Sequence, residues 1–245
     1  MKSSLKETTE NSEVSPENLP ATQTPADVAV PPNDFFKNGE MEGEFDASDI
    51  QIPRFNLSHP VGDLSEKFQP GHLIYNREVD LGMGPVEFTL LKLRKFFIES
   101  LPFGSEVKPR IFQTQAEVLK AGLFLIHEKQ QRGEDAEYAK PALDVTMLVK
   151  GRPEDLAFPF EIQGTPYAIC TWTLQSIAFS TTGKKLITAS QLGLRNGLTA
   201  ATWLIQPKRE KFGPNFVWVP YVSAGKKNTP EFQAEVKELL GSFGG

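Results

Sequence analysis

Basic and aromatic side chains stand together at three places in this 245-residue sequence. Cations neutralise the phosphates of a nucleic-acid strand, and aromatic rings stack on its bases, each stacked base contributing about 1–3 kcal/mol. The residues that we expect to contact such a strand are Lys92, Arg94, Lys95, Phe96 and Phe97 in the first cluster, Trp172, Lys184 and Lys185 in the second, and Lys208, Arg209, Lys211, Phe212, Trp218 and Tyr221 in the third. The alternative for each cluster is a core aromatic ring beside solubilising lysines at a strand edge, with no ligand.

Residues suited to covalent or metal chemistry are sparse and far apart. The histidines are His59, His72 and His127, and none has a second histidine or a cysteine at the spacing of metal ligands. The single cysteine, Cys170, lies within an apolar segment, so we expect a buried structural thiol rather than a nucleophile. Two Gly-Lys-Lys sites lack the earlier glycine and the following Ser or Thr of a phosphate-binding loop. The sequence therefore predicts a protein that is not an enzyme and that needs no cofactor and no metal.

Charge is unevenly distributed along the chain. The formal net charge is −5, but residues 1–50 contain 3 basic and 11 acidic residues, a net charge of −8, whereas the remainder contains 23 basic and 20 acidic residues, a net charge of +3. Residues 1–32 also lack aromatic side chains, so this part cannot bury enough apolar surface to fold. We therefore expect a disordered acidic N-terminal arm over residues 1–48, followed by a single domain over residues 49–245.

Composition also limits the cellular setting. Hydrophobic residues make up 39% of the chain, which is enough for a core, but no apolar run approaches the 20 or so residues that cross a bilayer. The N-terminus has no apolar signal-peptide core, and one cysteine permits no intramolecular disulfide. These features predict a cytoplasmic protein without membrane contact.

The order of local signals predicts a β-rich α+β domain. Expected strands, recognised by alternating apolar side chains between turn residues, cover 72–75, 86–98, 123–126, 144–149, 165–180 and 216–222. Expected helices cover 114–121, which begins with a Thr-x-x-Glu capping box, 188–205 and 229–240. Lys184 and Lys185 are expected in the turn that follows the strand at 165–180. Because the chain has no βαβ repeat, we expect the strands to be antiparallel.

Two segments carry a resemblance to a known group of proteins. Residues 49–57 (DIQIPRFNL) and 68–76 (FQPGHLIYN) resemble the opening of bacteriophage-encoded single-stranded-DNA-binding proteins, in which an acidic, Ile-Pro and apolar segment precedes a Pro-Gly, apolar and Asn strand. The later order is similar as well, with a basic and aromatic strand at 86–98, a helix with small residues at 190–205 and a closing amphipathic helix at 229–240. The resemblance spans roughly residues 49–240.

The resemblance implies an OB-like antiparallel β-barrel with appended helices. It also implies a protein that coats single-stranded DNA with little sequence preference during phage-type replication or recombination, in the cytoplasm of a bacterial host cell. One departure is the C-terminus, which has no acidic residue after Glu238. We therefore expect the acidic N-terminal arm, rather than a C-terminal tail, to recruit replication or recombination proteins.

Two other classes of function stay open. A structural or assembly protein of a virion would use exposed aromatic side chains as anchors of protein–protein contacts, and its oligomers would survive high salt. A metal-dependent nuclease or recombination enzyme would need a buried carboxylate cluster, for which acidic pairs such as Glu78 with Asp80 are the candidates. The sequence leaves the oligomeric state open, and a homo-oligomer is one candidate.

Overall fold

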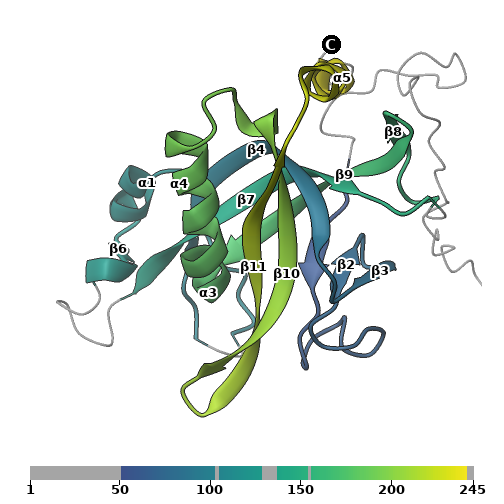
Figure 1. Cartoon of the computed structure of the whole chain (residues 1–245). Helices are drawn as coiled ribbons and strands as arrows, with labels where there is room; N and C mark the ends of the chain where they lie inside the picture. Colours follow the sequence, from purple (N-terminus) through teal and green to yellow (C-terminus); the bar gives the residue numbers. More distant parts are fainter. Residues whose placement is uncertain (1–50, 103–104, 129–136, 154–155, 242–245) are drawn as a thin grey trace, which may run out of the picture.

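The computed structural model describes residues 51–102, 105–128, 137–153 and 156–241 (Figure 1). The predicted acidic arm over residues 1–48 lies outside the described residues. Neighbouring strands are antiparallel, apart from one short parallel pair and one parallel bridge, and the helices are short and few. The predicted β-rich class with antiparallel sheets is therefore confirmed.

The elements of the described residues follow in chain order. The strands are β1 (Phe55–Leu57), β2 (Leu73–Tyr75), β3 (Val79–Gly82), β4 (Val86–Glu99), β5 (Ile111–Phe112), β6 (Phe124–Leu125), β7 (Tyr138–Lys150), β8 (Phe160–Ile162), β9 (Thr165–Gln175), β10 (Ala201–Phe212) and β11 (Asn215–Lys227). The helices are α1 (Gln115–Lys120), α3 (Ser176–Ala178), α4 (Lys184–Leu192) and α5 (Pro230–Gly241), with a π-helical turn (Phe179–Gly183) between α3 and α4 and 3-10 turns at Ile126–Glu128 and Leu198–Ala200.

One large sheet organises the domain, and its strand order is β11-β10-β4-β7-β9-β8. Every long strand of this sheet contributes to a single core, which contains Phe88, Val145, Trp172, Ile205 and Val222. The sheet therefore curls around one face, which we call the inner face. Strands β1, β2 and β3 form a small second sheet whose apolar side chains also join this core.

The opposite, outer face of the large sheet is covered at one end by the C-terminal helix. In α5, Phe232 and Val236 pack on Leu148 of β7 and Ile162 of β8. The helix begins as expected, because the side chain of Thr229 accepts a hydrogen bond from the Phe232 N–H at 3.2 Å. Figure 1 shows α5 at the top of the molecule.

Several sequence predictions are confirmed. The strand predicted at 86–98 is β4, and the helix predicted at 229–240 is α5. The capping box before α1 is present, because the Thr114 side chain accepts a hydrogen bond from the Glu117 N–H. Gly122 follows α1 with a φ of 79°, a left-handed conformation that ends many helices.

Two predicted elements are wrong. The strand predicted at 165–180 ends at Gln175, and the chain continues as α3, the π-helical turn and α4. The helix predicted at 188–205 ends at Leu192, because Gly193 and Gly197 interrupt it, the latter with a φ of 93°. Residues from 201 onward form β10, in which packing of alternate side chains into the core outweighs the helical spacing seen in the sequence.

Strand pairing does not close the sheet into a barrel in the described part of the chain. Strands β9 and β11 flank the opening, and the helical segment from α3 to α4 spans it. The Thr182 hydroxyl donates to the Pro220 carbonyl, and Lys185 Nζ donates to the Val222 carbonyl at 2.7 Å. These bonds satisfy carbonyl groups on the free edge of β11, which protects that edge from pairing with another chain.

No helix of the described residues is long and apolar enough to span a membrane.

The only cysteine is buried in the centre of β9, and its surroundings make its reactivity predictable. Burial raises the pKa of the Cys170 thiol, so the thiolate is disfavoured in the folded protein. We expect Cys170 to resist a disulfide reagent in the native protein at mildly alkaline pH and to react fully in denaturant. Because the pKa of this thiol is raised in the folded protein, its contribution to the free energy of unfolding is fully present below the unfolded thiol pKa of about 8.5. That contribution decreases as pH rises above this value. Rapid reaction of the native thiol would contradict this packing.

Candidate nucleic-acid interface

Strands β10 and β11 extend beyond the body of the domain as a two-stranded ribbon, at the bottom of Figure 1. Strand β4 pairs with residues 202–205 of β10, whereas β10 and β11 stay paired with each other to the tip. Pro207 lies opposite Pro220, and proline is tolerated there because β10 has no second neighbour at that point. We call residues 206–221 the ribbon, and it carries the whole third cluster.

The turn at the tip sets the register of the ribbon. Gly213 and Pro214 connect the strands, and Gly213 has a φ of 59°, the conformation that glycine adopts at the first position of a tight hairpin turn. In the resulting register, Lys211 lies opposite Phe216.

One face of the ribbon combines cations with aromatic rings. Opposite residues of an antiparallel pair share a face, and side chains alternate along each strand. Ile205 lies opposite Val222, and both belong to the core. Every second residue along each strand from this pair lies on the same face, which therefore carries Arg209, Lys211, Phe216 and Trp218. We call these four residues the inner ribbon face.

The inner ribbon face presents these groups to solvent at the tip. The Arg209 guanidinium lies 4.6 Å from the centroid of the Phe216 ring, a cation–π arrangement. Phe216 is 53% exposed; Phe212, at the end of β10, belongs by the same alternation to the outer face and is 62% exposed. An exposed ring beside a guanidinium offers a stacking surface and a phosphate contact within one short stretch.

The outer ribbon face is less positive. Lys208 Nζ lies 4.7 Å from the centroid of the Tyr221 ring, and the Tyr221 hydroxyl donates a hydrogen bond to the Glu210 carboxylate. This hydrogen bond raises the pKa of Tyr221. Because Glu210 lies close to Lys208 in the same face, it offsets part of the positive charge there. The inner face is therefore the stronger candidate for contact with phosphates.

The base of the inner ribbon face rests on the connection between β1 and β2. A Cβ atom added to Gly71 would lie 2.8 Å from atoms of the Trp218 indole, so the ring packs directly on the glycine backbone. Gly71 has a φ of 91° and donates its N–H to the Ser58 carbonyl at 2.8 Å. The Ser58 N–H donates in turn to the His72 carbonyl at 2.9 Å, and its hydroxyl donates to the Phe68 carbonyl.

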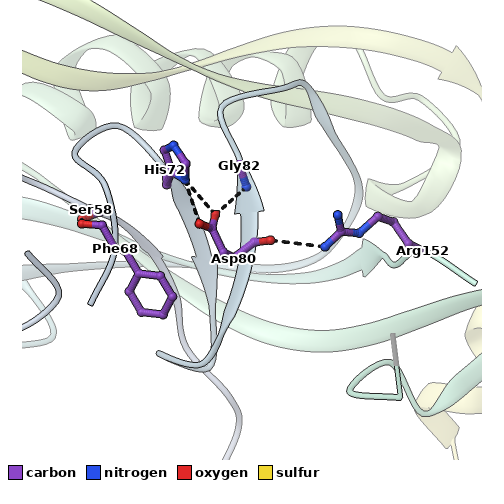
Figure 2. A network of polar contacts seen from close by, with 6 residues as sticks. All are labelled: Ser58, Phe68, His72, Asp80, Gly82 and Arg152. Carbon is purple, nitrogen blue, oxygen red and sulfur yellow. Dashed lines mark hydrogen bonds and ion pairs between the residues drawn. The ribbon is translucent and has the colours of Figure 1, made fainter. Parts of the chain in front are cut away.

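A polar network fixes this connection from its other side, and Figure 2 shows its members. His72 Nδ1 lies 2.8 Å from Asp80 Oδ2, and Asp80 Oδ1 accepts a hydrogen bond from the Gly82 N–H at 2.7 Å. Arg152 donates to the Asp80 carbonyl at 3.3 Å. Because His72 directly follows Gly71, these contacts hold the glycine in position under Trp218.

The first predicted cluster is divided between the two faces of β4. Beyond an irregularity between Leu90 and Lys92, the register places Lys92, Arg94 and Phe96 on the outer face of the large sheet. Lys95 and Phe97 lie on the inner face. Both phenylalanine rings are 5% exposed, so neither offers a surface to a base, and we leave them out of the candidate interface.

Of the cations in this cluster, Arg94 is engaged within the protein. Its guanidinium lies 2.6 Å from Asp144 Oδ2, and the Thr173 hydroxyl donates to Asp144 Oδ1 at 2.7 Å. Lys95 lies 5.3 Å from the Phe97 ring centroid. Lys92 is exposed, and the described residues contain no ion pair with it.

Lys92 belongs to a row of polar residues across the outer face. Lys92 lies opposite Thr146, Thr146 lies opposite Thr171, and Thr171 forms a bridge with Arg54. With neighbouring strands about 4.8 Å apart, the two cations are separated by roughly 14 Å, and two threonines lie between them. Such a row can contact a phosphate backbone at several points.

The second predicted cluster is not brought together at a surface. Trp172 is 3% exposed and packs edge-on against Phe55, with ring centroids 5.6 Å apart. Lys184 and Lys185 belong to the start of α4 rather than to a turn, and Lys185 is bonded to the edge of β11 as described above. We therefore leave Trp172 and Lys185 out of the candidate interface.

Two residues of the interface were not singled out from the sequence. Phe216 lies two residues before Trp218 in the predicted strand at 216–222, so the two rings share a face, and this spacing was the available signal. Arg54 had no signal, because its place beside Thr171 depends on a contact between segments far apart in the chain.

Comparison of the chain with family models, curated proteins and solved structures gives no match. Within the described ranges, no three or more His, Cys, Asp or Glu side chains are grouped as metal ligands.

Proposed function

We propose that this protein binds single-stranded DNA without catalysis and with little sequence preference. The observation that carries the proposal is the inner ribbon face, where Arg209 and Lys211 lie on the same surface as the exposed ring of Phe216. Cations that follow a phosphate backbone, together with rings on which bases stack, are the two components of such binding. The affinity then comes mostly from phosphate neutralisation and depends strongly on salt.

The strand order supports an OB-like barrel as the framework for this binding. In an OB fold, three meandering strands are followed by a helix and a hairpin, and the first hairpin strand pairs back with the first strand of the meander. Strands β4, β7 and β9, the segment α3 to α4, and the hairpin β10–β11 follow the same order, and β10 pairs with β4. On this assignment, the ribbon is the hairpin loop that OB folds use to contact oligonucleotides.

The resemblance of residues 49–57 and 68–76 supports a setting in phage-type replication or recombination, in the cytoplasm of a bacterial host. In this setting the protein coats exposed strands, and the acidic N-terminal arm recruits replication or recombination proteins.

The direct test is a fluorescence-anisotropy titration of the full chain with a labelled oligothymidine and with a duplex of the same length. We expect salt-sensitive binding that favours the single strand, with the logarithm of the binding constant decreasing by about 0.7 per phosphate contact for each tenfold increase in salt. Absence of binding at low salt would overturn the proposal.

The exposed rings of Phe212 and Phe216 also support a second candidate, a virion assembly protein that uses them as anchors of protein contacts. Sedimentation at high salt separates the two candidates. Large oligomers that persist there, from a protein that binds no DNA, would favour the assembly role.

A further inference from the structure

A cavity of about 420 Å³ lies at the base of the ribbon, where strand pairing leaves the sheet open between β9 and β11. Its walls come from β1, the end of β9, α3 and residues 217–220 of β11. The volume lies within the range of about 300–1,000 Å³ that is typical of small-molecule sites. The cavity is therefore large enough for a planar ring system.

The lining of the cavity matches the chemistry of a nucleobase. Leu57, Ala178 and Trp218 supply apolar and aromatic surface, while His59 and Gln175 supply hydrogen-bonding groups. Desolvation lowers the pKa of His59, which favours the neutral imidazole, a form with one donor and one acceptor. A base needs this combination, because its faces are apolar and its edge is polar.

The backbone at the rim of the cavity has an unusual conformation. Ser176, which also lines the cavity, has a φ of 50°, in the left-handed region that favours glycine. Non-glycine residues held in this region concentrate at ligand sites, where the surrounding structure maintains the strain.

The cavity is continuous with the inner ribbon face, and cations flank it. Trp218 belongs to both, since it follows Phe216 along that face and also lines the cavity. Arg54 is also among the residues that line the cavity, and Arg209 lies directly across from Trp218 in the ribbon. A strand that lies along the inner ribbon face therefore reaches the cavity at Trp218, with Arg209 beside it and Arg54 among the lining residues.

We propose that this cavity accepts one base of the bound single strand, which stacks against Trp218 while the flanking phosphates stay outside near Arg54 and Arg209. The inference rests on the proposed function, because the strand that supplies the base is the one held by the ribbon. It adds a specific insertion site to an interface that otherwise binds the backbone and any exposed base.

The test compares two variants, one that fills the cavity from the α3 side and one with the same substitution outside the cavity. Ala178→Leu adds a larger side chain at the cavity wall, and Ala189→Leu makes the same change at a partly buried alanine of α4 outside the cavity. We expect Ala178→Leu to weaken oligothymidine binding by about 10-fold, the value of one lost stacked base, and Ala189→Leu to leave it unchanged. Thermal unfolding of both variants shows whether the fold is intact.

Intrinsic fluorescence supplies a readout at the site itself. Of the three tryptophans, Trp172 and Trp203 are each 3% exposed, whereas Trp218 is partly exposed. Because Trp172 and Trp218 both line the cavity, the Trp218→Phe variant identifies which ring is quenched. We expect oligothymidine to quench the wild-type protein and the Ala189→Leu variant. The quenching should be lost in Trp218→Phe and reduced in Ala178→Leu.

A photo-crosslink keeps the inference testable even where Ala178→Leu does not fold. Oligothymidine with one 5-iodouracil is irradiated with the wild-type protein, and the attached residue is identified by mass spectrometry. Attachment at Trp218 or His59 supports base insertion, whereas attachment confined to Phe212 and Phe216 overturns it and leaves the proposed function standing. Absence of any single-strand binding by the wild-type protein overturns both.

Discussion

Replacement of Lys208, Arg209 and Lys211 together by alanine lowers the affinity for oligothymidine by about 100-fold at low salt and makes the salt dependence shallower. All three side chains are exposed on the ribbon, and two of them belong to the inner ribbon face. Loss of two or three phosphate contacts changes the slope of log affinity against log salt by about 1.4–2.1, at about 0.7 per contact. Anisotropy titrations at a series of salt concentrations measure both effects.

A charge-matched control separates a local contact from the overall field of the protein. Lys120 on α1, Arg195 after α4 and Lys237 on α5 are also exposed, and their replacement by alanine removes the same three charges outside the ribbon. We expect this control to bind with nearly wild-type affinity and slope. Equal loss of affinity in the two triple variants would show that net charge, rather than the ribbon, determines binding.

Gly71→Ala destabilises the protein by about 2–5 kcal/mol, because two costs add at one position. A φ of 91° is unfavourable for any L-residue, at about 1–2 kcal/mol, and the new Cβ atom would lie 2.8 Å from the Trp218 indole, which adds an overpacking cost of about 1–3 kcal/mol. Urea unfolding measures the loss of stability. A shifted emission spectrum reports the displacement of Trp218.

Gly62 in the same connection between β1 and β2 provides the control. It has a φ of 117°, but no atom lies within 4 Å of the position of its added Cβ. Gly62→Ala therefore carries the conformational cost alone, about 1–2 kcal/mol, and should leave the Trp218 spectrum unchanged. If the two variants lose the same stability, the contact between Gly71 and Trp218 contributes nothing measurable.

Local signals in the sequence were sufficient for elements whose conformation is decided by neighbouring residues. The Thr114 capping box and Gly122 mark the two ends of α1, and Thr229 caps the start of α5. The run of β-branched and aromatic residues after Pro85 forms β4. In each of these the deciding interaction spans only a few residues. The helix predicted at 188–205 was wrong because residues from 201 onward belong to β10. The conformation of β10 is decided by its pairing with β4 and β11, which joins residues distant in sequence.

The candidate interface depended far more on tertiary structure. Alternation shows which side chains of a strand share a face, but it does not show which face is covered. In β4 the irregularity between Leu90 and Lys92 also moves Leu93, rather than Lys92, onto the face of Leu90. Phe96 and Phe97 are consequently buried, and the cations beside them point to opposite faces.

By itself, the sequence determined the composition of the third cluster, because its cations and rings occur within 14 residues, and the strand at 216–222 that carries part of it. The partner strand β10 and the turn that joins it to β11 were not predicted. Tertiary structure alone decided that the ribbon leaves the body beyond residue 205, that Trp218 rests on Gly71, and that Arg54 joins Lys92 in one row. The physical reason is that exposure and contact are set by packing between segments far apart in the chain, whereas residue type and local turn chemistry are set by near neighbours.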